Sequence, residues 1–167
     1  MPLTFLVGTA SDAFKGDLAT SVANELRSRY SFVAAEIAEP YESEPVTVNG
    51  WRELQSVMDS MLGGSRLSQV EAYQAVFIPG AVGGVDHVEV PAVADPLQVA
   101  SLETLVDELR RFADQAQLPT GDLELMQLAA DYLESAADTE LDFQTYVQLM
   151  LSAKQAIARK QALWIVS

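Results

Sequence analysis

The chain of 167 residues has no cysteine, and His87 is its single histidine. Without cysteine the protein can form no disulfide, no thiolate site for zinc and no cysteine nucleophile. Zinc sites in proteins usually take two or more histidines or thiolates, so one imidazole is too few to build one. We therefore expect no metal site and no bound cofactor, and the sequence leans away from an enzyme without deciding the question.

Long apolar runs are also missing. The apolar run near the N-terminus stops at Val7 and follows no basic segment, so it does not resemble a signal peptide. The apolar stretch around Phe77 is interrupted by Pro79 and Gly80, whereas a membrane-spanning helix needs about 20 consecutive apolar residues. We therefore expect a cytoplasmic protein that does not enter a membrane.

Positive charge is scarce, with 10 lysines and arginines against 24 aspartates and glutamates and a net charge of −14. Such a surface repels phosphates, which disfavours direct binding of DNA, RNA or anionic membranes. It would attract a basic protein instead. The same composition is typical of adaptation to a salty cytoplasm, so the acidity has two interpretations at this stage.

The distribution of apolar residues predicts one α+β domain that spans residues 1–167. Apolar residues make up 49% of the chain, which is typical of a globular protein with its own core. Helical spacing and strand-like patterns alternate along the first hundred residues, and helical spacing dominates afterwards. The predicted helices are 17–30, 51–62, 101–113, 122–133 and 139–157, and the predicted strands are 3–8, 32–37, 46–48, 72–78, 85–90 and 163–167.

From these elements we expect a small mixed or antiparallel sheet, formed mainly by the first ~100 residues and packed against a helical C-terminal segment. The final strand returns to the sheet and lies beside residues 3–8. The stretch 73–90 is interpreted as an antiparallel hairpin, since glycines in its middle favour a turn. A doubly wound α/β fold is the alternative.

The loop after the first predicted strand is one candidate site. Residues 8–17 combine a strand end, small polar residues and a helix start, where backbone amides can hold an anion. The spacing does not match a Walker A motif, and the polar residues are also good helix caps. If this loop acts with the lone histidine, the protein binds a small molecule or nucleotide, or is an enzyme, through Thr9, Ser11, Asp12, Lys15 and His87.

The second candidate is a long acidic segment. Between Arg111 and Lys154 there are 42 residues with eight carboxylates and neither lysine nor arginine. Like charges three or four positions apart on a helix repel each other, and no local cation relieves them. The predicted binding face consists of Asp122, Glu124, Asp131, Glu134, Asp138, Glu140 and Asp142.

Three of these carboxylates begin like a calcium-binding loop, at Asp138, Glu140 and Asp142, but phenylalanine and leucine occupy the positions that require glycine and glutamate. Calcium binding is therefore not predicted. The preferred hypothesis is a protein-interaction or regulatory module of the immunity, antitoxin or nucleic-acid-mimic type, which presents carboxylates to a basic partner. Small-molecule binding at the loop after the first strand is the alternative.

Overall fold

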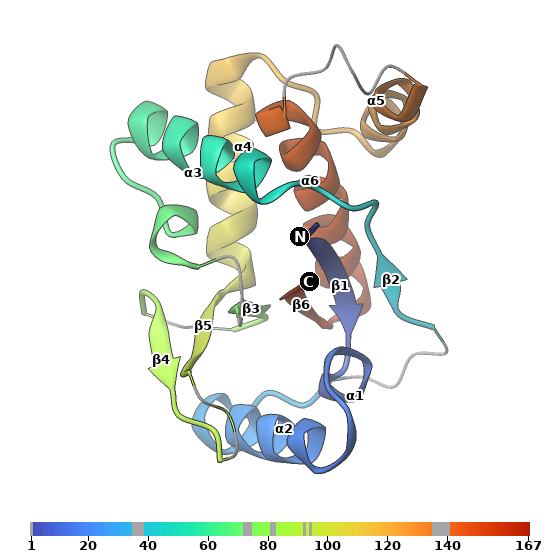
Figure 1. The fold of residues 1–167 in the computed structure, drawn as a ribbon. Coiled ribbons are helices and arrows are strands. Elements are labelled where there is room, and N and C mark those ends of the chain that lie inside the picture. Colours follow the sequence, from blue (N-terminus) through green and yellow to red (C-terminus); the bar gives the residue numbers. More distant parts are fainter. Residues whose placement is uncertain are drawn as a thin grey trace.

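The computed structural model describes residues 2–34, 39–71, 75–80, 83–91, 93, 95–134 and 141–167. Its helices are α1 (Ala10–Ala13), α2 (Gly16–Tyr30), α3 (Val48–Leu62), α4 (Leu102–Ala116), α5 (Asp122–Glu134) and α6 (Leu141–Arg159), with a short 3-10 turn at Leu67–Gln69 (Figure 1). Its strands are β1 (Thr4–Gly8), β2 (Tyr41–Glu42), β3 (Ala75–Ile78), β4 (Asp86–Val88), β5 (Leu97–Ser101) and β6 (Ala162–Val166).

The strands form one mixed sheet in the order β2-β1-β6-β3-β5-β4. Only the β3–β5 pair is parallel among the strand pairs in the described ranges. The last strand lies antiparallel to the first, with Phe5 opposite Ile165 and Val7 opposite Leu163. The predicted α+β class and the return of the final strand to the sheet are both confirmed.

Helices cover both faces of the sheet (Figure 1). Helices α3, α4 and α6 lie on one face, and α1 and α2 lie on the other. Along β1 the side chains alternate, so that Phe5 and Val7 join the core under α3, α4 and α6, while Leu6 joins the core under α2. Because both faces are buried, the inner strands are apolar at nearly every position.

The predicted hairpin over residues 73–90 is wrong. β3 and β4 are not neighbours, because β5 lies between them, parallel to β3 and antiparallel to β4. No strand was predicted at β5, which contains the polar residue Gln98. In the fold this side chain is buried, and its Oε1 accepts a hydrogen bond of 2.8 Å from the backbone N–H of Glu71. A satisfied amide can thus lie within a buried strand.

The segment before α3 also differs from the prediction. Val46 forms an isolated bridge with Leu3, and α3 begins at Val48, so Gly50 lies inside the helix and not in a turn. Thr47 caps this helix, since its Oγ1 accepts a 2.9 Å hydrogen bond from the N–H of Gly50. The predicted strand 32–37 is irregular at 32–34, and its remainder lies outside the described residues.

Several predicted helix ends are confirmed. Ser101 caps α4 by accepting a hydrogen bond from the N–H of Thr104, and Gly63 ends α3 with a left-handed backbone. Thr139, at which the last predicted helix begins, lies outside the described residues. Within the described ranges, no helix is long and apolar enough to cross a membrane.

Candidate functional site

The predicted acidic residues lie mainly on α5, at the outer edge of the molecule beside α6 and away from the sheet (Figure 1). α5 carries Asp122, Glu124, Asp131 and Glu134, all of them exposed. Asp142 lies in the first turn of α6 and is half-buried. Asp138 and Glu140 lie outside the described residues. One helix therefore brings four of the seven predicted carboxylates together.

One side of α5 holds the helix on the molecule. Leu125 is fully buried, and Leu128, Ala129 and Tyr132 are half-buried against the main core. These four residues occupy positions i, i+3, i+4 and i+7, so they share one side of the helix. This side packs against α6. The rest of the helix surface faces solvent, including the carboxylates.

A lysine from α6 changes the electrostatics at one of these carboxylates. The Lys154 ammonium forms an ion pair with Asp122 and also donates a 2.6 Å hydrogen bond to the carbonyl of Thr120. The acidic segment between Arg111 and Lys154 contains no lysine or arginine of its own. The fold brings Lys154, which follows that segment, to Asp122 at the start of α5, so Asp122 anchors the first turn of this helix.

The other α5 carboxylates differ from Asp122. Asp131 accepts a 3.0 Å hydrogen bond from the side-chain amide of Gln127. Among the ion pairs in the described part of the chain, none involves Glu124, Asp131 or Glu134. At 100° per residue these three carboxylates fall within an arc of about 80° on the helix. They form an exposed negative surface with which no cation of the described residues forms an ion pair.

The second region is a cavity of about 220 Å³ beside the end of β1. Its polar lining consists of Thr9, Ser11, Asn24 and Arg27, and its apolar lining includes Leu26, Phe32, Val33 and the Trp164 indole. The Arg27 guanidinium donates a 2.7 Å hydrogen bond to Asn24 Oδ1, and among the described residues it has no carboxylate partner. The cavity thus combines one cation with an aromatic and aliphatic wall.

In the loop at this cavity, the carboxylate of Asp12 accepts the hydrogen bond of the backbone amide of Thr9. Asp12 Oδ2 accepts hydrogen bonds from the N–H of Thr9 at 2.8 Å and from the Thr9 hydroxyl at 2.9 Å. Gly8 leaves room for this arrangement, since a Cβ there would lie 2.5 Å from Asp12 Oδ2. The N–H of Thr9 is therefore taken by Asp12. Lys15 is exposed and does not line the cavity.

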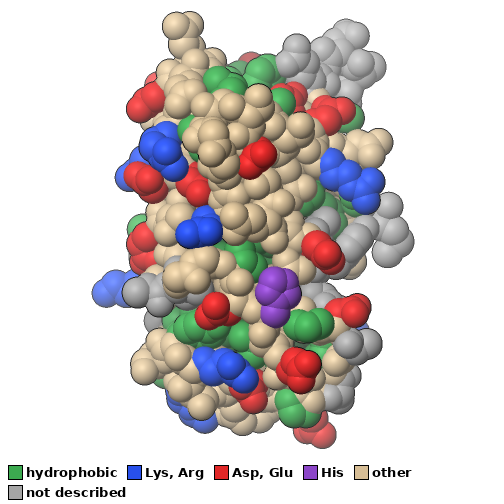
Figure 2. Space-filling view, turned by 90° about the vertical axis from the view of Figure 1, so that its left-hand side faces the viewer, with side chains coloured by type: hydrophobic (Ala, Val, Ile, Leu, Met, Phe, Trp, Pro, Cys, Tyr) green, Lys and Arg blue, Asp and Glu red, His purple; other side chains and the backbone are tan. Residues whose placement is uncertain are grey.

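His87 lies far from this loop. It is exposed on β4, at the edge of the sheet, and Figure 2 shows it on a surface where acidic and basic side chains are interspersed. Three strands separate β4 from β1, which amounts to about 19 Å at the usual strand spacing. The structure brings Thr9 and Ser11 together at one cavity, but it does not bring His87 to them.

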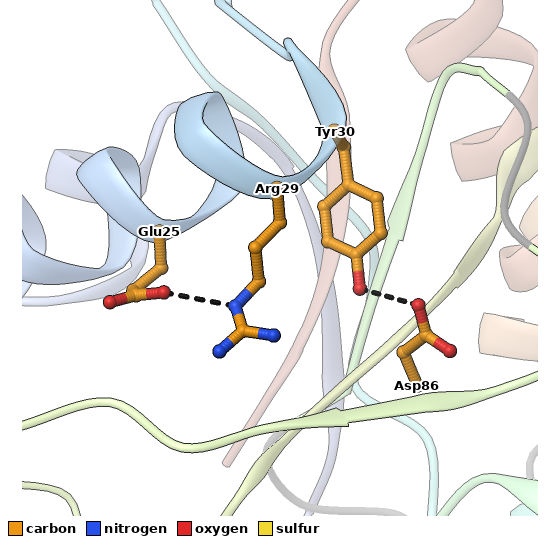
Figure 3. A network of polar contacts seen from close by, with 4 residues as sticks. All are labelled: Glu25, Arg29, Tyr30 and Asp86. Carbon is orange, nitrogen blue, oxygen red and sulfur yellow. Dashed lines mark hydrogen bonds and ion pairs between the residues drawn. The ribbon is translucent and has the colours of Figure 1, made fainter.

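Asp86, which precedes His87 on β4, forms a contact that the sequence did not predict. The Tyr30 hydroxyl at the end of α2 donates a 2.7 Å hydrogen bond to Asp86 Oδ2 on β4 (Figure 3). Burial of the phenol, together with the Asp86 carboxylate, holds the pKa of Tyr30 well above its ordinary value. Arg29, the residue before Tyr30, pairs with Glu25 one turn earlier on α2 at 3.0 Å. The Tyr30–Asp86 hydrogen bond fastens the end of α2 to the edge of the sheet.

The buried carboxylate of Glu108 was also not predicted from the sequence. Glu108 on α4 accepts hydrogen bonds of 2.8 and 3.0 Å from the N–H of Arg66, and burial raises the pKa of its carboxyl. Its position three residues after Leu105 and four before Phe112 places it on the apolar stripe of α4, and this spacing was a usable signal. Its partners are backbone amides of the turn after α3, which gives it a structural role.

Within the described ranges, no group of three or more carboxylates and histidines is arranged to hold a metal ion. The arrangement therefore offers two surfaces of different chemistry, the exposed carboxylates of α5 and the cavity at Arg27. Comparison of the chain with protein-family models, with curated proteins and with solved structures found no match in any of the three.

Proposed function

We propose that this protein is a cytoplasmic interaction or regulatory module that presents the carboxylates of α5 to a basic protein. The observation that supports this function is the exposed set Glu124, Asp131 and Glu134, which has no ion pair in the described part of the chain. Repulsion between neighbouring carboxylates on a helix costs a few tenths of a kcal/mol per pair. Cations from a partner would remove that repulsion when they bind.

The charge of the whole chain favours the same partner. A net charge of −14 attracts a basic protein during diffusion and speeds its association, while it repels nucleic acids. Immunity proteins, antitoxins and nucleic-acid mimics are the classes of protein that use carboxylates in this way. Such binding is sensitive to salt, because the Debye length falls from about 10 Å at 0.1 M to about 3 Å at 1 M.

The test begins with capture of partners from a lysate of the source organism at low salt and at roughly 0.5 M salt, where exposed charge pairs are screened. The captured protein is then purified, and its affinity is measured with a variant that carries Glu124→Lys, Asp131→Lys and Glu134→Lys. We expect this variant to lose most of the affinity. An unchanged affinity would refute the proposal.

A matched control keeps the overall charge change the same. Glu53, Glu71 and Glu89 are exposed and lie outside α5, so their replacement by lysine changes the net charge by the same amount. If the proposal holds, this control variant retains nearly the affinity of the wild type. Equal losses in both variants would mean that net charge, and not the surface of α5, governs binding.

A second candidate function, binding of a small molecule, is favoured by the cavity at the loop after β1. Arg27 suits an anionic group such as a carboxylate, and Phe32 and Trp164 suit an apolar or aromatic body. Ligand binding raises the melting temperature by mass action. In a screen of small aromatic and aliphatic carboxylates, Arg27→Ala or Ser11→Ala should abolish any such rise, and Lys15→Ala should preserve it. No rise with any of these compounds would argue against this function.

A further inference from the structure

α5 has a second apolar side that nothing in the described part of the chain covers. Leu123 is 83% exposed, Leu133 is 63% exposed and Met126 is 55% exposed. Ala130 is exposed between them. We refer to these four residues, Leu123, Met126, Ala130 and Leu133, as the α5 stripe. It differs from the side of the helix that packs on α6 through Leu125.

The spacing of the α5 stripe suits a partner helix. Its members follow one another at intervals of three, four and three residues, which is the spacing of the apolar seam in a coiled coil. At 100° per residue they fall within about 80° of arc. A helix on the surface of a globular protein usually carries one apolar stripe, which faces the core. The second stripe on α5 is therefore available to another molecule.

The carboxylates adjoin this stripe along one side. At 100° per residue, Glu134 lies about 20° beyond Leu123 at the edge of the stripe, and Asp131 and Glu124 lie about 80° and 100° beyond it on the same side. On the other side the helix meets α6, where Asp122 is already paired with Lys154. Any helix that docks on the α5 stripe therefore places one of its flanks beside Glu134, and lysines or arginines on that flank extend toward Asp131 and Glu124, which have no ion pair within the described residues.

This charge arrangement selects the occupant. A second copy of the chain would bring another acidic protein of net charge −14, with carboxylates of its own beside its stripe. An anionic membrane would be repelled for the same reason. A helix with lysines or arginines along one flank would instead gain both apolar burial and charge pairing.

We propose that the α5 stripe is the docking site for an amphipathic basic helix of a partner protein, with apolar residues at three- and four-residue spacing and Lys or Arg beside them. This inference rests on the proposed function and adds the apolar half of the recognition. The partner helix packs its apolar residues against Leu123, Met126 and Leu133, and its cations contact Glu124, Asp131 and Glu134.

The test uses synthetic helical peptides as probes and the full-length protein. The first peptide is basic and amphipathic, with leucines at three- and four-residue spacing. A second has the same composition with its leucines scrambled, and a third replaces lysine with glutamate. Affinities are measured by fluorescence anisotropy at 0.05 M and 0.5 M salt. We expect binding of the first peptide, at least tenfold weaker binding of the second, and no binding of the third.

Two protein variants locate the site. The variant with Leu123→Gln and Leu133→Gln loses apolar contacts but keeps its helix propensity. Its affinity for the first peptide should be about tenfold lower than that of the wild type, or lower still, at both salt concentrations. A control with Met61→Gln and Ile157→Gln changes exposed apolar residues elsewhere and should bind like the wild type. Circular dichroism checks that both variants remain folded, which is expected because the residues are exposed.

The outcomes separate this inference from the proposed function. If the scrambled and amphipathic basic peptides bind equally and the glutamine variant is unaffected, the stripe plays no part and only the carboxylates bind. If no basic peptide binds at half-millimolar concentration, the inference is overturned, and the lysate experiment judges the proposed function separately. If light scattering shows a dimer that Leu123→Gln with Leu133→Gln dissociates, a second copy is the occupant and the inference is wrong.

Discussion

At the scale of single residues, two buried polar side chains hydrogen-bond to backbone groups far away in the sequence. Glu108 accepts hydrogen bonds from the N–H of Arg66, 42 residues earlier. The buried Tyr146 hydroxyl donates a 2.7 Å hydrogen bond to the carbonyl of Pro119, and burial raises the pKa of Tyr146 to about 12. Such groups stabilise the fold only because each has a partner.

Glu108 should make stability depend on pH. Its folded pKa lies above the ordinary value of 4.5, so between those two values the folded chain keeps a proton that the unfolded chain has lost. The free energy of unfolding therefore falls as pH rises through this window. In Glu108→Gln this fall is missing, so the stability of the variant relative to the wild type should improve from pH 4 to pH 7.

Urea unfolding of both proteins at several pH values measures this difference. Any hydrogen bond that the glutamine cannot reproduce costs the same at every pH, so it changes the offset between the two proteins and not the trend. A difference that stays constant from pH 4 to pH 7 would show that Glu108 does not hold its proton more tightly in the folded state.

At the scale of elements, the helices pack closely enough to dictate residue size. Gly50 lies in the first turn of α3 where this helix meets α6. A Cβ at this position would lie 2.6 Å from Thr145 Oγ1 and 2.9 Å from the carbonyl oxygen of Leu141. Thr145 is held in place, since its hydroxyl donates a 2.9 Å hydrogen bond to that carbonyl. This contact explains a glycine inside a helix, where propensity alone favours alanine.

Replacement of Gly50 by alanine should therefore destabilise the protein. Helix propensity favours the change by about 1 kcal/mol, but the clash with α6 should reverse the sign and cost about 1–3 kcal/mol of unfolding free energy. Gly121→Ala is the control, because a Cβ at Gly121 would lie 3.5 Å from Glu124 Oε1, which is an ordinary van der Waals distance. Denaturant unfolding of both variants compares them, and a stabilised Gly50→Ala protein would contradict the packing described here.

At the scale of the whole molecule, charge is unevenly distributed. The cations occur alongside carboxylates on the face shown in Figure 2, which carries His87 and β4. α5 instead carries carboxylates without lysine or arginine. A net charge of −14 also opposes the compact state, because like charges are closer together when the chain is folded.

Salt should therefore raise the melting temperature of the wild type between 0.05 M and 0.5 M, because it screens this repulsion. The variant with Glu124→Lys, Asp131→Lys and Glu134→Lys has a net charge of −8, since each replacement adds two to −14. Its gain in melting temperature over the same range should be smaller. Equal gains, measured by differential scanning calorimetry, would show that these carboxylates do not contribute to the repulsion.

The sequence alone predicted the helices from α2 to α6, several of their ends, the apolar first and last strands, and the acidity of the surface. These features depend on residue spacing and composition, which are local properties. It also indicated that the final strand lies beside the first, since an apolar strand at the chain end must be buried to be stable.

The tertiary fold determined which strands are neighbours and which charges meet. It inserted β5 between β3 and β4, brought Lys154 to Asp122, and placed His87 about 19 Å from the strand that leads to Thr9. It also left the α5 stripe exposed, although its apolar spacing alone predicts burial. The reason is physical. Contacts between residues far apart in the chain depend on how whole elements pack, and no local pattern encodes that packing.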